Sequence, residues 1–160
     1  MRIYKIALNT ENIWYHGSDR FDIQKFQASE NKFQLLGNGI YFYKNSEPAK
    51  QYGSFIYSIK ISPQKYNIAD ENFRLSYDDI GGIFNKTFTN KDPSGVLNPI
   101  WWATEGWNYY KLDRKETIDK ISQYIQNQLG FDGIKAIYGN GGLVLCMWKK
   151  YDTLIPHIVS

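Results

Sequence analysis

The chain has 160 residues, which fits one domain spanning residues 1–160 and is long enough to bury a sizeable core. Hydrophobic residues make up 42% and charged residues 22%, and these proportions are typical of a folded protein rather than a disordered one. The net charge of +3 is small, and the lysines form no long run, so the sequence does not indicate a nucleic-acid-binding protein.

The single cysteine, Cys146, excludes an intramolecular disulfide and a metal site built from several thiolates. It stands in the apolar run at residues 143–147, which favours a small buried side chain over a nucleophile. No apolar stretch reaches the length of a membrane span, and the N-terminal residues lack the core of a signal peptide. We therefore expect a reduced, cytoplasmic setting, with no membrane partner and no metal.

The first predicted elements are two strands separated by a long polar segment. Residues 13–16 form the first strand candidate, which Gly17 ends. A polar, loop-like segment follows at residues 19–36. The second strand is predicted at residues 39–43, where the aromatic and β-branched content is high.

A short helix and a third strand follow. The helix is predicted to begin with Asn45 or Ser46 as its N-cap, with Pro48 in its first turn, and to end at Gly53. Residues 55–62 alternate apolar and polar side chains over much of their length, which predicts a strand.

The middle of the chain favours helices. Residues 77–88 are interpreted as helical, although the glycine pair at 81–82 weakens that interpretation. Residues 100–107 fit either a helix or an aromatic loop. Residues 116–129 are predicted to form a helix that is capped by Gly130. Its apolar stripe has spacings of three, four and four residues, and consists of Ile118, Ile121, Ile125 and Leu129.

Strands return at the end of the chain, at residues 133–137, 143–148 and 153–155. His157 is interpreted as structural or exposed. Because strands dominate both ends and helices the middle, we predict an α+β fold with a mixed or antiparallel sheet rather than a doubly wound one.

Three short motifs carry the functional signal: Trp-Tyr-His-Gly-Ser at residues 14–18, Gly-Asn-Gly-Ile-Tyr-Phe at 37–42 and Ala-Lys-Gln-Tyr-Gly at 49–53. Their residue types suit cleavage of the bond between nicotinamide and ribose in NAD. That reaction needs flat faces that hold the ring and a site in which positive charge can develop on the ribose. A histidine can bond a ribose hydroxyl, the adjacent glycine lets a ligand reach the backbone, and two tyrosines can sandwich the ring.

In this order, the motifs resemble those of the ADP-ribosyltransferase superfamily, in the histidine-tyrosine branch that includes diphtheria toxin and the poly(ADP-ribose) polymerases. The resemblance implies two packed, mostly antiparallel sheets that form an NAD cleft, with NAD as co-substrate. It assigns catalytic roles to His16 and Tyr41. The implied NAD-binding residues are His16, Gly17, Ser18, Gly39, Tyr41, Ala49 and Tyr52.

The sequence departs from the family pattern at two places. Ala49 stands where the branch has a serine that helps to bind the carboxamide. In addition, no carboxylate precedes the strand at residues 143–147, where many members have a catalytic glutamate. Asn140 can bond a ribose hydroxyl there but cannot act as a base. Glu105 is the carboxylate that a loop could supply instead, although a solvated loop glutamate is the simpler interpretation.

The resemblance and the missing glutamate together imply a mono-ADP-ribosyltransferase that modifies a macromolecule, with a protein favoured and a nucleic acid left open as acceptor. The small size suggests an effector of a phage, a mobile element or a bacterial toxin system, such as an anti-CRISPR protein. An alternative is a catalytically silent module that binds NAD, ADP-ribose or a protein. A relative of the tRNA 2′-phosphotransferases is disfavoured, because the sequence has no concentrated set of arginines.

A purely structural interpretation of the motif residues also stays open. In that interpretation Tyr41 and Tyr52 are core aromatics, and His16 is a hydrogen-bonded core histidine.

Overall fold

The strands of this protein form one mixed sheet. The computed structural model describes residues 12–28, 34–138 and 142–159. Within them, seven strands are arranged in the order β4-β5-β6-β2-β1-β3-β7, and only the β4–β5 pair is parallel. The strands are β1 (Ile13–Ser18), β2 (Ile40–Tyr43), β3 (Phe55–Lys60), β4 (Ile68–Ala69), β5 (Gly133–Tyr138), β6 (Gly142–Met147) and β7 (His157–Ile158).

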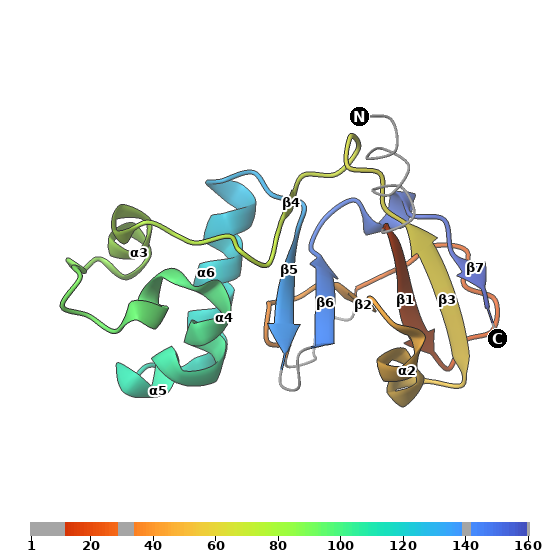
Figure 1. Ribbon diagram of the computed structural model, residues 1–160, viewed down its shortest axis with the longest axis horizontal. Coiled ribbons are helices and arrows are strands. Elements are labelled where there is room, and N and C mark those ends of the chain that lie inside the picture. The colour runs from red at the N-terminus through yellow and green to blue at the C-terminus, as the bar shows by residue number, and fades with distance from the viewer. Residues whose placement is uncertain (1–11, 29–33, 139–141, 160) are drawn as a thin grey trace.

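Most of the helices lie between β4 and β5 in the chain and gather at the β4–β5 end of the sheet (Figure 1). They are α3 (Tyr77–Phe84), α4 (Pro99–Trp101), α5 (Trp107–Tyr109) and α6 (Arg114–Asn127), with a 3₁₀ turn at Ser94–Leu97 and a π-helical segment at Trp102–Gly106. The short helix α2 (Ser46–Ala49), which continues into the 3₁₀ turn Lys50–Tyr52, instead lies beside β1 and β3. The α+β class with helices in the middle of the chain is therefore confirmed.

The longest helix, α6, follows directly from its sequence. The side chain of Asp113 caps it by accepting a hydrogen bond from the backbone of Glu116 at 2.9 Å. The predicted stripe Ile118, Ile121 and Ile125 is buried, with exposed fractions of 5% or less. The helix ends with Gln128 as its C-cap, so the predicted cap at Gly130 is two residues too late.

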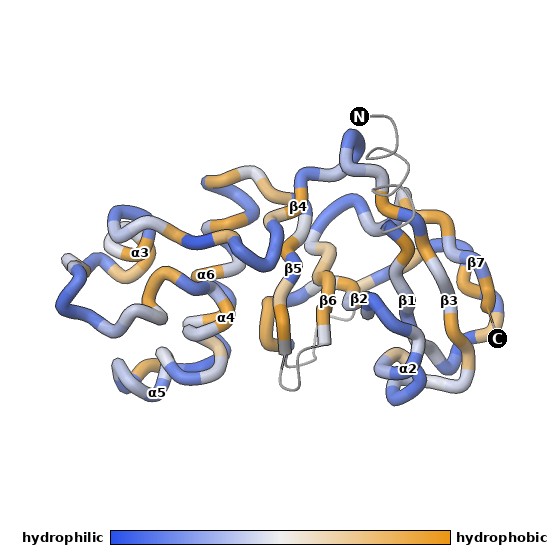
Figure 2. The backbone as a smooth tube through the Cα atoms, in the orientation of Figure 1, coloured by the Kyte–Doolittle hydropathy of each residue, from blue (hydrophilic) through white to orange (hydrophobic). Residues whose placement is uncertain are grey.

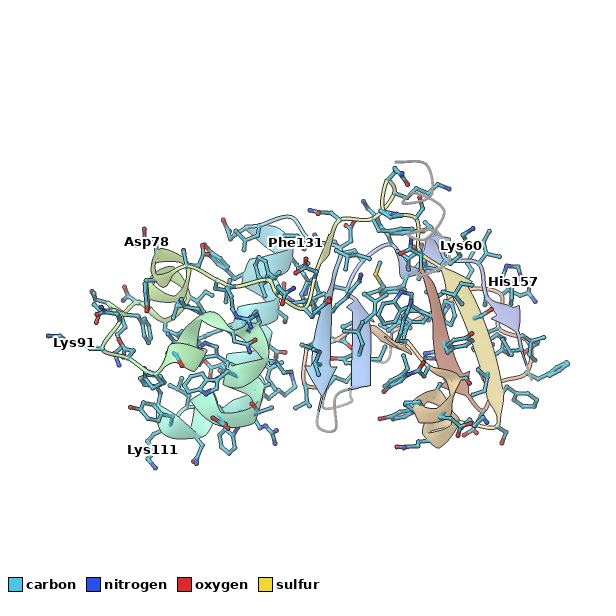
Figure 3. All side chains as sticks on the ribbon, viewed as in Figure 1. Lys60, Asp78, Lys91, Lys111, Phe131 and His157 are labelled. Atoms are coloured by element: carbon cyan, nitrogen blue, oxygen red, sulfur yellow. The ribbon has the colours of Figure 1, made fainter. Side chains whose placement is uncertain are left out.

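Other element boundaries differ from the predictions. The helix expected at residues 77–88 ends at Phe84, because Asn85 adopts a left-handed conformation with φ of 52°. Residues 100–107, which fit either a helix or a loop, are helical. Residues 153–155 are not a strand. The first of them ends the 3₁₀ turn Tyr151–Thr153, and the pairing to β3 occurs later in the chain, in β7. His157 of β7 is exposed at the edge of the sheet, as expected (Figure 3).

The two sheets implied by the family resemblance are instead one sheet with a weak junction. β1 pairs with β3 at six positions and β2 pairs with β6 at four, but β1 and β2 pair only at Tyr15 and Tyr43. This junction divides the sheet into two half-sheets, β4-β5-β6-β2 and β1-β3-β7. Past Tyr15, β1 continues through His16 to Ser18 without a further pair to β2.

Two hydrophobic clusters hold the fold together, and strand β6 contributes alternate side chains to both of them. Cys146 belongs to the cluster that includes the buried face of α6, whereas Leu145 and Met147 belong to a second cluster with Trp14 and Phe42. Cys146 is fully buried, as predicted, and burial raises the pKa of its thiol. Figure 2 shows hydrophobic residues in β5, next to the helices, and hydrophilic residues in the loop beyond α3.

Charged side chains of the helical part, including the labelled Asp78, Lys91 and Lys111, project away from the sheet (Figure 3). None of the helices in the described part of the chain is both long and apolar enough to cross a membrane.

Candidate functional site

A cleft of about 710 Å³ opens where β1 and β2 cease to pair, and residues of both strands line it. Its volume lies within the range of small-molecule sites. Six of the seven predicted NAD-binding residues contribute to its wall. They are His16, Gly17, Ser18, Gly39, Tyr41 and Tyr52.

His16 is held in a fixed orientation on β1. Its Nδ1 lies 2.8 Å from the backbone oxygen of Tyr41. Because a carbonyl oxygen only accepts, Nδ1 carries the proton, and the lone pair of the neutral ring is on Nε2. The ring packs edge-on against Phe26, with centroids 5.2 Å apart, and against Phe42 at 5.5 Å. The strand junction therefore positions the imidazole at the cleft.

Tyr41 lines the cleft, and its hydroxyl group holds the turn that precedes β2. The hydroxyl donates to the backbone oxygen of Gly37 at 2.8 Å and accepts from the backbone nitrogen of Leu36 at 2.9 Å. This hydroxyl is committed to the fold, so Tyr41 offers a ligand its ring rather than a hydrogen bond.

The two predicted tyrosines do not face each other in the way the motif implied, because Tyr52 stacks on Tyr43. The centroids of these two rings are 5.3 Å apart and their planes differ by 12°. Burial raises the pKa of Tyr43, and the neighbouring Tyr52 raises it further. Tyr52 is 58% exposed, so its other face is open to solvent. Sequence reasoning missed Tyr43, although its two-residue offset from Tyr41 on a strand places both side chains on one face.

The fold itself explains the two motif glycines. A Cβ on Gly17 would overlap the backbone oxygen of Ala49, so glycine is required for α2 to pack on β1. A Cβ on Gly39 would lie 2.5 Å from the backbone oxygen of Met147, so glycine is required beside β6. The close contact with Ala49 gives Gly17 a structural role in addition to its place on the cleft wall, and ligand approach at Gly17 stays a prediction.

Two other predicted residues are not brought to the described cleft. Ala49 is fully buried behind Gly17 and is absent from the cleft wall. Glu105 lies on the π-helical segment, exposed and distant from the wall, where its Oε2 accepts a hydrogen bond from Trp101 Nε1 at 2.9 Å. Its assignment as a catalytic residue is not supported, because the segment belongs to the helical part rather than to a loop at the sheet. Asn140 lies outside the described residues.

The cleft has charged residues that the motifs did not reveal. Asp19, Arg20 and Lys25, from the segment between β1 and β2, contribute to its wall. Arg20 and Lys25 form no ion pair with the residues that the structure describes. The signal in the sequence is their position shortly after His-Gly-Ser, in the segment that the sequence predicts to be a polar loop.

No protein-family model and no curated protein sequence matches this chain. Among solved structures, one described as the crystal structure of an anti-CRISPR protein aligns with 92% of this chain and 94% of its own, with 13% sequence identity and a TM-score of 0.43. A similarity at this level does not establish a shared fold. The family therefore stays a prediction from the motifs.

Proposed function

We propose that this protein is an NAD-dependent mono-ADP-ribosyltransferase that transfers ADP-ribose to a macromolecule and releases nicotinamide. The observation that carries the proposal is the convergence of three separate motifs, through His16, Tyr41 and Tyr52, on the wall of one cleft. We favour a protein as acceptor.

The charges and rings of the cleft support NAD as the ligand. The exposed face of Tyr52 suits stacking of the nicotinamide ring, and the Tyr43 ring supports Tyr52 from behind. Arg20 and Lys25 supply positive charge for the pyrophosphate, which carries two negative charges. Nε2 of His16 can accept a hydrogen bond from a ribose hydroxyl.

These contacts fit the chemistry of the proposed reaction. Nicotinamide leaves as a neutral molecule, so the site must hold the ribose while positive charge develops there rather than supply a strong nucleophile. His16, whose ring is fixed by Tyr41 and Phe26, would keep the ribose in one orientation as the bond breaks. The product would be a single ADP-ribose unit, because the described cleft lacks a late-strand acid to activate a second ribose.

The test is to incubate the purified protein with NAD labelled in its nicotinamide and adenine parts. Release of nicotinamide, and adenine label on a protein from a host lysate, would support the proposal. Mass spectrometry should then find one ADP-ribose unit per site. His16→Ala should reduce release of nicotinamide with little change in unfolding temperature. If His16→Ala instead unfolds the protein while binding per folded molecule persists, the structural interpretation of His16 is correct.

The second candidate function is a silent module that binds NAD or ADP-ribose. The burial of Ala49 and the position of Glu105 favour it, since neither supplies the group that the family uses. The labelled-NAD experiment separates the two functions, because a silent module binds NAD without releasing nicotinamide.

A further inference from the structure

The described wall of the cleft contains a single acidic side chain, that of Asp19. Asp19 lines the cleft directly after the His-Gly-Ser motif, whereas the family's carboxylate precedes a late strand. We infer that the Asp19 carboxylate is a catalytic general base, which accepts the proton of the group that attacks the ribose. This inference rests on the proposed function and names the base that accepts the proton of the first acceptor; it does not replace the late-strand acid whose absence limits the product to a single ADP-ribose unit.

The backbone of Asp19 is fixed by the β3 side of the sheet. Gly53 packs so closely on Ser18 and Asp19 that a Cβ on Gly53 would overlap the Ser18 carbonyl group. The Oδ1 atom of Asp19 accepts a hydrogen bond from the backbone nitrogen of Ser54 at 3.3 Å. The carboxylate is thus attached to the turn between α2 and β3, the same turn that carries Tyr52.

The residues after Asp19 are also held in place. The hydroxyl of Tyr57, a buried residue of β3, donates to the backbone oxygen of Arg20 at 2.6 Å and accepts from the backbone nitrogen of Ile23 at 3.3 Å. The backbone nitrogen of Arg20 bonds Ser18 Oγ at 3.1 Å. The segment that follows Asp19 is therefore held against β3, and a catalytic carboxylate needs such a fixed position.

The proposed step balances as follows. The bond between the nicotinamide nitrogen and C1′ of the ribose breaks, and its electron pair leaves with nicotinamide. An oxygen of the acceptor, or of water in its absence, forms a new bond to C1′ and loses a proton to the Asp19 carboxylate. Because Asp19 is exposed, the carboxyl group then returns that proton to solvent.

The segment between β1 and β2 offers matched controls, since its acidic residues are Asp19, Asp22 and Glu30. Asp22 is exposed and absent from the cleft wall, and Glu30 lies outside the described residues. Asp19→Asn removes the charge but keeps an Oδ1 atom for the Ser54 hydrogen bond, so the variant should fold normally. The experiment measures nicotinamide release and NAD affinity for the wild type, Asp19→Asn, Asp22→Asn and Glu30→Gln.

We expect Asp19→Asn to release nicotinamide about 100-fold more slowly or worse, with NAD affinity within about threefold of the wild type. Asp22→Asn and Glu30→Gln should match the wild type. Azide, a nucleophile with no proton to lose, should restore release in Asp19→Asn. The inference is overturned if Asp19→Asn is fully active, if it loses NAD binding, if azide does not restore release, or if Glu30→Gln is the inactive variant.

The wild type reports on the proposed function separately. If it binds NAD but releases no nicotinamide, the transferase proposal and this inference both fail. If it releases nicotinamide and Asp19→Asn does so equally fast, only the inference about Asp19 fails.

Discussion

The helical part and the cleft both contain stacked aromatic rings, but the two stacks have opposite relations to solvent. In the helical part, Trp102 lies between Phe84 and Tyr110, with centroid distances of 4.5 Å and 5.3 Å, and is 1% exposed. In the cleft, Tyr52 lies on Tyr43 and is 58% exposed.

Because of this difference, the buried stack can contribute only to stability, whereas the exposed stack also offers a ring face for a ligand. Both stacks use the same attraction between flat rings, but only the first is surrounded by other apolar groups. The buried stack contributes to the free energy of folding. The exposed stack leaves one ring face to water, where a ligand can replace that water. The aromatic residues, 17% of the sequence, therefore occupy two kinds of environment, and exposure distinguishes them.

The strongest way to break the comparison is to truncate the buried ring. Trp102→Ala should destabilise the protein by about 3–5 kcal/mol, because it leaves a large cavity and removes the hydrogen bond from Trp102 Nε1 to the Val96 oxygen. Denaturant unfolding measures this loss. Tyr109→Ala is the control, since Tyr109 is 60% exposed and its truncation should change stability by no more than about 0.5 kcal/mol. Equal losses in both variants would contradict a core centred on Trp102.

The second prediction tests the packing behind the cleft. Gly17→Ala should destabilise the protein by about 1–3 kcal/mol, because the new methyl group pushes α2 from β1. NAD binding should weaken as well, since Tyr52 moves with α2. Gly82→Ala in α3 is the matched control: nothing lies within 4 Å of its new Cβ, and the protein should gain about 0.5–1 kcal/mol. A stable Gly17→Ala variant would show that the contact with Ala49 is not required.

The third prediction concerns the exposed stack. Tyr52→Ala should weaken NAD binding about 2- to 10-fold while leaving stability almost unchanged, since only one face of the ring is packed. Tyr52→Phe should bind almost as well as the wild type. Calorimetry with NAD measures both affinities. If Tyr52→Phe abolished activity, the hydroxyl rather than the ring face would be the functional group.

The smallest effect is expected at a polar contact of the helical part. Burial raises the pKa of Asp79, but hydrogen bonds from Ser76 and from the Tyr124 hydroxyl outweigh it and hold the pKa below the usual 3.8. A depressed pKa contributes stability that is present above 3.8 and is lost as the pH falls through the lower value of the folded state.

Tyr124→Phe should therefore cost about 1 kcal/mol or less at neutral pH and should make the protein lose less stability on acidification. Unfolding measured on both sides of the usual aspartate pKa tests this. An unchanged slope of stability against pH would mean that the hydroxyl of Tyr124 does not influence Asp79.

Local patterns in the sequence were sufficient where a single element decides its own structure. The stripe of α6 predicted its buried face, and the alternation of residues 55–62 predicted β3. The order of the three motifs also predicted a common cleft. Boundaries were wrong where a cap rather than a pattern ends an element, as at Asn85.

The sequence alone thus determined the α+β class and six residues of the cleft wall, because hydrophobic period and motif order are local properties of the chain. Only the tertiary structure decided the rest. The single β1–β2 pair, the stack of Tyr52 on Tyr43 and the place of Asp19 on the cleft wall each depend on contacts between different elements of the fold. Such contacts depend on how the strands pair across the sheet, and no local pattern encodes that pairing.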